Sequence, residues 1–212
     1  MRKLVLLLLL SNFVVKGQKT FTNSVHGDLT FNQVQGDGYV GFNHIGFQVG
    51  FGTMFKVSEN HRLGFEINYA QRGSRQRINL KKQVVNDFKL YTNYVDVPVF
   101  YIFPKWGVHF ELGPVFSFLV NEPTHSVNGI QSTSSDDYNN IELGLLLSAN
   151  FKISEKLYFK IRANNSVTGI FKTPEESTGY FWQSGAFHRG LGVNLSYYFS
   201  SPNIGDSGTL EL

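Results

Sequence analysis

Residues 45–57 read IGFQVGFGTMFKV, and this stretch decides the fold. Starting at Ile45, every second residue gives the series Ile, Phe, Val, Phe, Thr, Phe, Val. The residues between them are Gly, Gln, Gly, Gly, Met and Lys. Because a β-strand turns successive side chains to opposite faces, this alternation predicts a strand with one bulky apolar face and one slender face.

The same alternation recurs along the chain, and no segment shows a convincing amphipathic helical period. The 20 Phe, 10 Tyr and 21 Gly residues are typical of β-structure. Eight strands are therefore predicted, at Val25–Gln33, His44–Val57, Arg62–Gly73, Phe88–Phe103, Val108–Asn121, Asn140–Ile153, Leu157–Val167 and Phe187–Phe199.

The connections between these strands alternate in length. Three are tight, at Ser58–His61, Pro104–Gly107 and Ser154–Lys156. Four are long and polar, at Val34–Asn43, Ser74–Asp87, Glu122–Asn139 and Thr168–Ala186. This sorting indicates a transmembrane barrel, whose periplasmic turns are short and whose outer loops are long.

Alternation alone does not say which face points inward, because a soluble lipocalin-like barrel alternates as well. The apolar face carries about 30 large side chains, more than the narrow interior of an eight-stranded barrel can hold. We therefore predict that this face meets lipid, where a closed barrel satisfies all of its backbone hydrogen bonds. Its members include Phe47, Phe51, Leu63, Phe65, Val95, Val97, Phe110, Leu112, Leu143, Leu145, Phe159, Ile161, Leu191 and Leu195, and the predicted lumen face includes Gly46, Gly50, Gly52, Gly64, Asn68, Gly113, Ser117, Gly144, Ser148, Gly190, Gly192 and Ser196.

The charged residues agree with this direction, because they share the lumen parity. An Arg or Lys at the lipid midplane would cost about 2–4 kcal/mol. The predicted lumen charges are Glu66, Asp96, Glu111, Glu142, Lys56, Lys152, Lys160 and Arg162, joined by His109 and His188. Ion pairs among them would plug a crowded lumen.

The first residues predict export. Met1–Lys3 is positively charged, an apolar run follows from Leu4, and the run breaks at Ser11-Asn12, too early for a membrane-spanning helix. A cleavable signal peptide is predicted at residues 1–17, with Gln18 as the first mature residue. The predicted barrel domain then covers residues 18–199, and a polar C-terminal tail covers residues 200–212.

The overall charge gives no support for a nucleic-acid partner. Of the 19 basic residues, Arg2, Lys3 and Lys16 lie in the predicted signal peptide, which leaves 16 basic residues against 16 acidic ones. The mature chain is near neutral and its charges are scattered. The chain has no cysteine, so it has no disulfide, thiolate metal site or lipidated cysteine.

Candidate chemistry is weak against structural explanations. The carboxylates Glu66, Asp96, Glu111 and Glu142 could form an acid–base group, but pairing with Lys56, Lys160 and Arg162 explains them better. His109 and His188 lack metal-ligand spacing, and Gln35–Gly38 lacks the further acidic ligands of a calcium loop. An enzyme would draw on His125, Ser126, Asp136 and Asp137 in the third long loop. No catalytic residue, cofactor or metal site is predicted.

Aromatic residues close to the strand ends suit the girdles at the two membrane interfaces. Some of them could instead pack the loops. They are Tyr69, Phe103, Trp106, Phe171, Trp182 and Phe187.

Two local motifs stand on neighbouring predicted strands, YAQRG at Tyr69–Gly73 and YVDVP at Tyr94–Pro98. They resemble the Y-x-Q-x-G strand end and the Y-x-[ED]-[IV]-P strand of the PorT-like outer-membrane β-barrel family typical of Bacteroidota. Gly113-Pro114 and Gly190–Gly192, leading into Tyr197–Phe199, follow in the same order. The resemblance covers roughly residues 24–199 and implies an eight-stranded barrel in a Gram-negative outer membrane. The family's namesake is associated with protein secretion, but most members have no assigned activity, and the resemblance does not extend to that role. In addition, this chain continues beyond the aromatic Phe199 on which such a barrel usually ends.

The sequence thus predicts an all-β fold, a single eight-stranded antiparallel up-and-down transmembrane β-barrel with both termini on the periplasmic side. The expected function is a structural or interaction role in the cell envelope without catalysis. Outer-membrane lipid and an envelope protein complex are the expected partners of a monomeric barrel. A small-ligand binder or narrow channel is the alternative, and an outer-membrane hydrolase or acyltransferase comes third.

Overall fold

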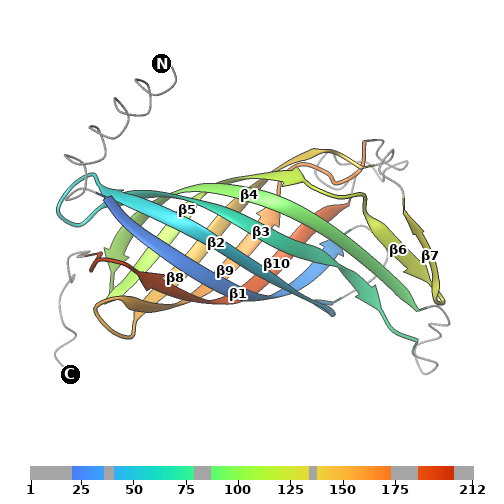
Figure 1. Cartoon of the computed structure of the whole chain (residues 1–212), viewed down its shortest axis with the longest axis horizontal. Helices are drawn as coiled ribbons and strands as arrows, with labels where there is room; N and C mark the ends of the chain where they lie inside the picture. Colours follow the sequence, from blue (N-terminus) through green and yellow to red (C-terminus); the bar gives the residue numbers. More distant parts are fainter. Residues whose placement is uncertain (1–20, 36–40, 79–86, 134–137, 173–185, 203–212) are drawn as a thin grey trace, which may run out of the picture.

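A computed structural model describes residues 21–35, 41–78, 87–133, 138–172 and 186–202. These residues form ten strands (Figure 1): β1 (Phe21–Gln35), β2 (His44–Lys56), β3 (Arg62–Gln76), β4 (Phe88–Lys105), β5 (Val108–Leu119), β6 (Thr124–Val127), β7 (Ile130–Thr133), β8 (Ile141–Lys152), β9 (Leu157–Ser166) and β10 (Phe187–Tyr198). In the described part of the chain, no helix is long and apolar enough to cross a membrane.

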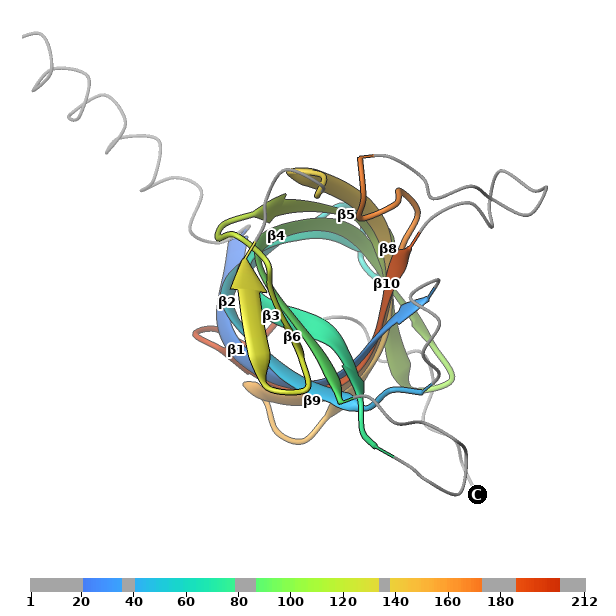
Figure 2. The same cartoon turned by 90° about the vertical axis from the view of Figure 1, so that its right-hand side faces the viewer.

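Eight of the ten strands close into a ring. The sheet runs in the order β3-β2-β1-β10-β9-β8-β5-β4, and β3 also pairs with β4. The first and last strands pair antiparallel, with Leu29 opposite Val193, and Tyr69 lies opposite Val95 at the β3–β4 contact. Figure 2 shows the closed ring along the barrel axis. The predicted eight-stranded antiparallel barrel is confirmed.

The strands β6 and β7 form a hairpin that the sequence analysis placed in a loop. A Val127-Asn128-Gly129-Ile130 turn joins them, and both central residues have positive φ, at 51° and 87°. Asn-Gly is the usual pair for such a tight hairpin turn. The hairpin extends the far end of β4 through β6, beyond the ring, at the right of Figure 1. The backbone N–H of Asp87 donates to Asn128 Oδ1 at 2.9 Å and fixes its tip.

Most of the other strand bounds lie within two residues of prediction, but β1 begins four residues earlier, at Phe21, and β3 ends three residues later. In particular, β3 continues to Gln76, where Ser74–Gln76 pair with Phe88–Leu90 of β4. These residues are polar, so apolar alternation does not mark them. The backbone pairing of β3 and β4 extends beyond the apolar alternation, because hydrogen bonds between strands do not depend on side-chain polarity.

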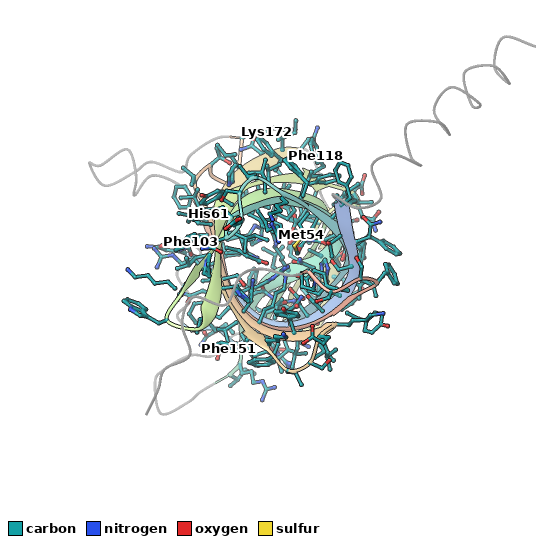
Figure 3. All side chains as sticks on the ribbon, turned by 90° about the vertical axis from the view of Figure 1, so that its left-hand side faces the viewer. Met54, His61, Phe103, Phe118, Phe151 and Lys172 are labelled. Carbon is teal, nitrogen blue, oxygen red and sulfur yellow. The ribbon has the colours of Figure 1, made fainter. Side chains whose placement is uncertain are left out.

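The outer wall is apolar, as predicted. Phe51 is 69% exposed and Ile67 54% exposed, although both are large and apolar. Seen from the short-turn end in Figure 3, Phe103, Phe118 and Phe151 project away from the ring, whereas Met54 lies inside it. The bulky set therefore faces outward, where lipid would cover it.

The predicted aromatic girdles have mixed outcomes. Trp106 is 69% exposed at the β4–β5 turn, with Lys105 Nζ 4.2 Å from its ring centroid. Phe171 instead packs on Tyr138, 5.0 Å away, next to a buried cluster at the long-loop end. It therefore serves loop packing rather than a girdle.

The lumen is not uniformly polar, which corrects the predicted glycine-rich and short polar filling. An apolar cluster fills the half nearest the short turns, made of Met54, Phe100, Ile102, Val115, Leu146, Tyr158 and Tyr198. Gly64 makes room for one of these rings, because a Cβ there would lie 2.6 Å from Phe100 Cε2. Large side chains thus pack against glycines of neighbouring strands in the narrow interior.

The first tail residues cross the short-turn mouth of the barrel. The buried Arg62 at the start of β3 donates from Nε and Nη2 to the Pro202 carbonyl, at 3.3 and 3.2 Å. Arg62 Nη1 also donates to the Ser58 carbonyl at 3.2 Å. Ser201 Oγ donates to Glu155 Oε2 at 3.1 Å, on the β8–β9 turn. Residues 199–202 are therefore part of the packed structure.

Some predictions fall outside the described residues and stay predictions. These are the signal peptide at residues 1–17 with its cleavage before Gln18, positions 36–38 of the Gln35–Gly38 turn, Asp136, Asp137, Trp182 and the tail from residue 203. The predicted domain boundaries likewise stay predictions.

Candidate functional site in the barrel lumen

An ion pair spans the lumen from one wall to the opposite wall. Glu66 lies on β3 and Arg162 on β9, and three strands separate them in either direction around the ring. Arg162 Nη1 and Nη2 donate to Glu66 Oε2 and Oε1 at 2.9 and 2.6 Å. Both side chains are 2% exposed. A bidentate guanidinium–carboxylate pair is among the strongest and most directional contacts that side chains form.

Small neighbours give these two long side chains the space to meet. Arg162 lies opposite Ser148 on β8 and Gly192 on β10. Glu66 lies opposite Gly52 on β2, where a Cβ would be 3.1 Å from Glu66 Cγ. The glycines of the lumen face thus leave the diameter open for this bridge.

Two further acids and a lysine surround the bridge. Arg162 Nη1 lies 3.5 Å from Asp28 Oδ2, and its Nη2 lies 3.7 Å from Glu111 Oε2. Lys160 Nζ lies 2.8 Å from Glu111 Oε1 and 3.8 Å from Glu66 Oε1. Buried charges need such compensation because burial removes their hydration.

Polar side chains satisfy the outer atoms of this central cluster. Asn68 Nδ2 donates to Glu66 Oε2 at 3.0 Å. His26 Nε2 lies 2.8 Å from Asn68 Oδ1 and 3.4 Å from Glu66 Oε2. Asn194 donates to Asp28 from the other side. The central cluster therefore joins side chains from β1, β3, β5, β9 and β10 into one layer.

A second charged layer lies closer to the long loops. Arg72 donates to Asp96, and its guanidinium stands 5.2 Å from the Tyr94 ring centroid. The Tyr94 hydroxyl donates to Glu142, and His188 Nδ1 donates to Glu142 Oε2 at 3.0 Å. This upper cluster ties β3 and β4 to β8 and β10.

The four predicted lumen carboxylates are each engaged by a basic or donor group. Glu66 and Glu111 pair with Arg162 and Lys160 as predicted, whereas Asp96 pairs with Arg72, and Glu142 with Tyr94 and His188. The arrangement can neutralise buried charge and close the lumen. A general acid–base role would need a substrate to reach a carboxylate. Glu66 and Glu142 are instead 2% and 1% exposed, inside the ring.

The predicted lumen position is wrong for two of the cations. Lys56 is exposed at the end of β2, and Lys152 is exposed near the β8–β9 turn, where its Nζ lies 2.9 Å from Glu155 Oε1. Both have lumen parity along their strands. Parity gives the direction of a side chain but not its position along the barrel axis. Lys56 and Lys152 lie at the short-turn end, beyond the charged clusters of the lumen.

The two predicted lumen histidines lie at opposite ends of the barrel. His109 packs on Tyr158 near the short turns, with the ring centroids 6.0 Å apart, whereas His188 belongs to the upper cluster. Of the loop candidates, His125 and Ser126 lie in β6, opposite Leu90 and Lys89 of β4. Among the described residues, no group of three or more His, Asp or Glu could hold a metal ion.

Five members of the two clusters were not predicted from the sequence: His26, Asp28, Arg72, Tyr94 and Asn194. A signal for three of them was present. His26 and Asp28 alternate with Val25, Gly27 and Leu29 along the first strand. Arg72 stands within the YAQRG motif, whose spacing puts it on the same face as Asn68 and Ala70.

Known structures share the fold. Neisserial surface protein A (NspA) matches with a TM-score of 0.54 at 17% identity, over 84% of this chain and 97% of that chain. A major outer membrane protein from Thermus thermophilus matches with a TM-score of 0.50 at 11% identity, over 84% and 99%. No curated protein matches the sequence.

The family is shown by a match over most of the chain. Residues 16–172 match the model of the outer membrane protein beta-barrel domain. With the closed ring and its apolar outer wall, this places the protein in an outer membrane. The chain belongs to the outer membrane protein beta-barrel domain family.

Proposed function

We propose that this protein is a closed, non-conducting barrel with a structural or interaction role in the cell envelope. The observation that carries the proposal is the Glu66–Arg162 bridge. It links opposite walls of the ring through two hydrogen bonds of 2.6 and 2.9 Å. The apolar cluster lies on the short-turn side of this bridge, and the upper cluster lies on its long-loop side. A lumen blocked in three layers leaves the wall and the loops as working surfaces.

Conductance in a planar lipid bilayer tests the closed lumen. The folded protein should give no steady ion current, while a general porin in the same bilayer supplies the positive control. A steady current from the purified protein would favour the alternative, a narrow channel, and would overturn the closed-lumen proposal.

The long-loop end is the proposed contact surface for an external protein or an envelope complex. The β6–β7 hairpin extends beyond the ring, and its tip exposes Val127 (41%) and Ile130 (78%). We propose that these two apolar side chains, which lie outside the membrane-facing wall, contact the partner. Outer-membrane lipid is the proposed partner of the apolar wall, around a barrel that we propose to be monomeric.

A pull-down of the intact protein in mild detergent tests this surface. A specific companion should be recovered with the native chain and reduced with Ile130→Ser. Replacing Val167, which is 54% exposed outside the hairpin, by Ser is the matched control. Recovery of only background proteins with all three chains would count against an interaction role.

The other functions have less support. The cavity at the upper cluster holds about 30 Å³, far below the roughly 300 Å³ of an ordinary small-molecule site. We propose that the protein is not an enzyme. Hydrolysis of lipopolysaccharide or peptides that disappears with His125→Ala or with Asp137→Ala would contradict this.

We also infer a kinship with the PorT-like barrels from the places of the two strand motifs. The YAQRG segment of β3 lies beside the YVDVP segment of β4, with Tyr69 opposite Val95 and Ala70 opposite Tyr94. Arg72, Tyr94 and Asp96 come from these motifs, and all three belong to the upper cluster. If this layer is what the motifs encode, then Arg72→Met should lower the unfolding midpoint. An unchanged unfolding midpoint would show that the two motifs do not stabilise the barrel through the upper cluster.

A further inference from the structure

Three residues that each carry an unpaired buried polar atom line a small cavity between the two charged clusters. The cavity holds about 10 Å³, and its lining includes Asp96, Arg162 and Asn164. One polar atom of each residue, Asp96 Oδ1, Arg162 Nε and Asn164 Oδ1, makes no hydrogen bond with any described residue. Asp96 is 1% exposed and Arg162 2%, so bulk solvent does not satisfy them.

The chemistry of these atoms selects an occupant. Arg162 Nε–H can only donate, whereas Asp96 Oδ1 can only accept when the carboxyl group is ionised, and the Asn164 oxygen also accepts. A metal cation would be repelled by the guanidinium, and an anion by the carboxylate. A water molecule can both accept and donate hydrogen bonds, up to two of each, and it needs about 10–15 Å³ and two to four polar partners.

We propose that one ordered water molecule occupies this cavity, accepting from Arg162 Nε and donating to Asp96 Oδ1 and Asn164 Oδ1. The water joins the two clusters into one network, because Asp96 belongs to the upper cluster and Arg162 to the central one. Val115 and Leu146 form an apolar part of the cavity wall. The inference concerns the interior of the barrel and does not depend on the proposed envelope role.

A second cavity, at the upper cluster, adjoins the smaller one. It holds about 30 Å³ and shares Gln48, Val115, Arg162 and Asn164 with the smaller cavity. Below lies the apolar cluster, whose side chains offer no comparable set of hydrogen-bonding groups. The proposed water therefore lies between the upper cavity and the apolar cluster.

Nuclear magnetic resonance of the full chain in lipid nanodiscs tests the proposal. The Hε proton of Arg162, assigned by its loss in Arg162→Lys, should show a direct cross-peak to a slowly exchanging water. The variant Asn164→Leu removes one acceptor and should weaken this cross-peak severalfold. Asn165→Leu is the matched control, because Asn165 is exposed on the opposite face of the same strand, and it should leave the peak unchanged.

Each other outcome overturns the proposal. A folded protein without a water cross-peak at Arg162 Hε would show that the cavity is dry or that Arg162 bonds elsewhere. Equal peaks in both asparagine variants would remove Asn164 from the site. A high-resolution crystal structure gives an independent reading that needs no variant. It should place one ordered oxygen within about 3.2 Å of all three atoms, and density typical of a metal ion would contradict the assignment.

Discussion

Two lysines on the β8–β9 hairpin form ion pairs of nearly equal length in opposite surroundings. Lys160 Nζ lies 2.8 Å from Glu111 Oε1 in the lumen, and Lys152 Nζ lies 2.9 Å from Glu155 Oε1 at the turn. The lumen partners are 2% and 0% exposed, whereas the turn partners are 39% and 73% exposed. Distance alone therefore cannot rank these pairs, and access to water must decide.

The two surroundings have different energetic consequences. An exposed pair typically contributes about 0–1 kcal/mol, because water already solvates both charges. Breaking a buried pair typically costs about 3–5 kcal/mol, because the remaining charge has lost its hydration and its partner. Replacing a whole buried pair by apolar residues is often neutral. The lumen pairs are thus costly to break singly rather than strongly stabilising.

The largest effect is expected at the bridge across the ring. Glu66→Leu leaves Arg162 without its bidentate partner and removes an acid 3.8 Å from Lys160. We expect a loss of about 3–5 kcal/mol in the free energy of unfolding. Urea titration in lipid vesicles measures it. Glu59→Leu, at an exposed turn position, is the control and should leave the midpoint in place.

A smaller loss is expected for the acid of the buried lysine pair. Glu111→Leu removes the partner 2.8 Å from Lys160, but Glu66 remains within 3.8 Å of that lysine. We expect a destabilisation of about 1–4 kcal/mol by the same titration. An unchanged unfolding midpoint would show that Lys160 is not held by this network.

A double variant sharpens the point. Glu111→Leu with Lys160→Met replaces both charges by apolar side chains of similar size, so no unpaired charge is left between these two positions. We expect it to recover most of the loss caused by Glu111→Leu alone. A double variant as unstable as the sum of its two single variants would mean that the two residues are not coupled.

The smallest effect is expected at the exposed pair. A hydrogen bond from Lys152 and, to a smaller extent, one from Ser201 lower the pKa of Glu155 below its ordinary value. A lowered carboxyl pKa adds stability above the ordinary pKa and loses it as the pH falls through the folded value. Lys152→Ala should raise the pKa of Glu155 in a carbon-13 titration and leave the urea midpoint unchanged. A midpoint shift as large as that of Glu111→Leu would erase the contrast between the two pairs.

The wall of the barrel was predictable from the sequence because each strand position has only two directions. Local geometry puts Phe47 and Phe51 on one face and Gly46 on the other, without knowledge of any other strand. Loop sorting and volume then set the direction for the whole chain. The β6–β7 hairpin escaped because a four-residue strand is too short to show alternation, although its Asn128-Gly129 turn carried a signal.

The pairing inside the lumen was only partly predictable. The set of charged residues followed from parity, but the choice of partner depends on ring closure and depth. Arg162 meets Glu66, 96 positions earlier, because β3 and β9 face each other across the ring. Lys56 has the same parity as a lumen residue yet lies at the strand end in solvent, and a single sequence does not give the depth.

The contact between Arg62 and Pro202 changes where the folded unit ends. A chain that stopped at the last aromatic, Phe199, would keep all ten strands but lose the carbonyl that accepts two hydrogen bonds from the buried Arg62. The Ser58 carbonyl, which accepts from Nη1 of the same guanidinium, would remain. The folded unit of this barrel therefore extends beyond its last strand. A domain boundary drawn at the end of β10 would cut through a packed contact.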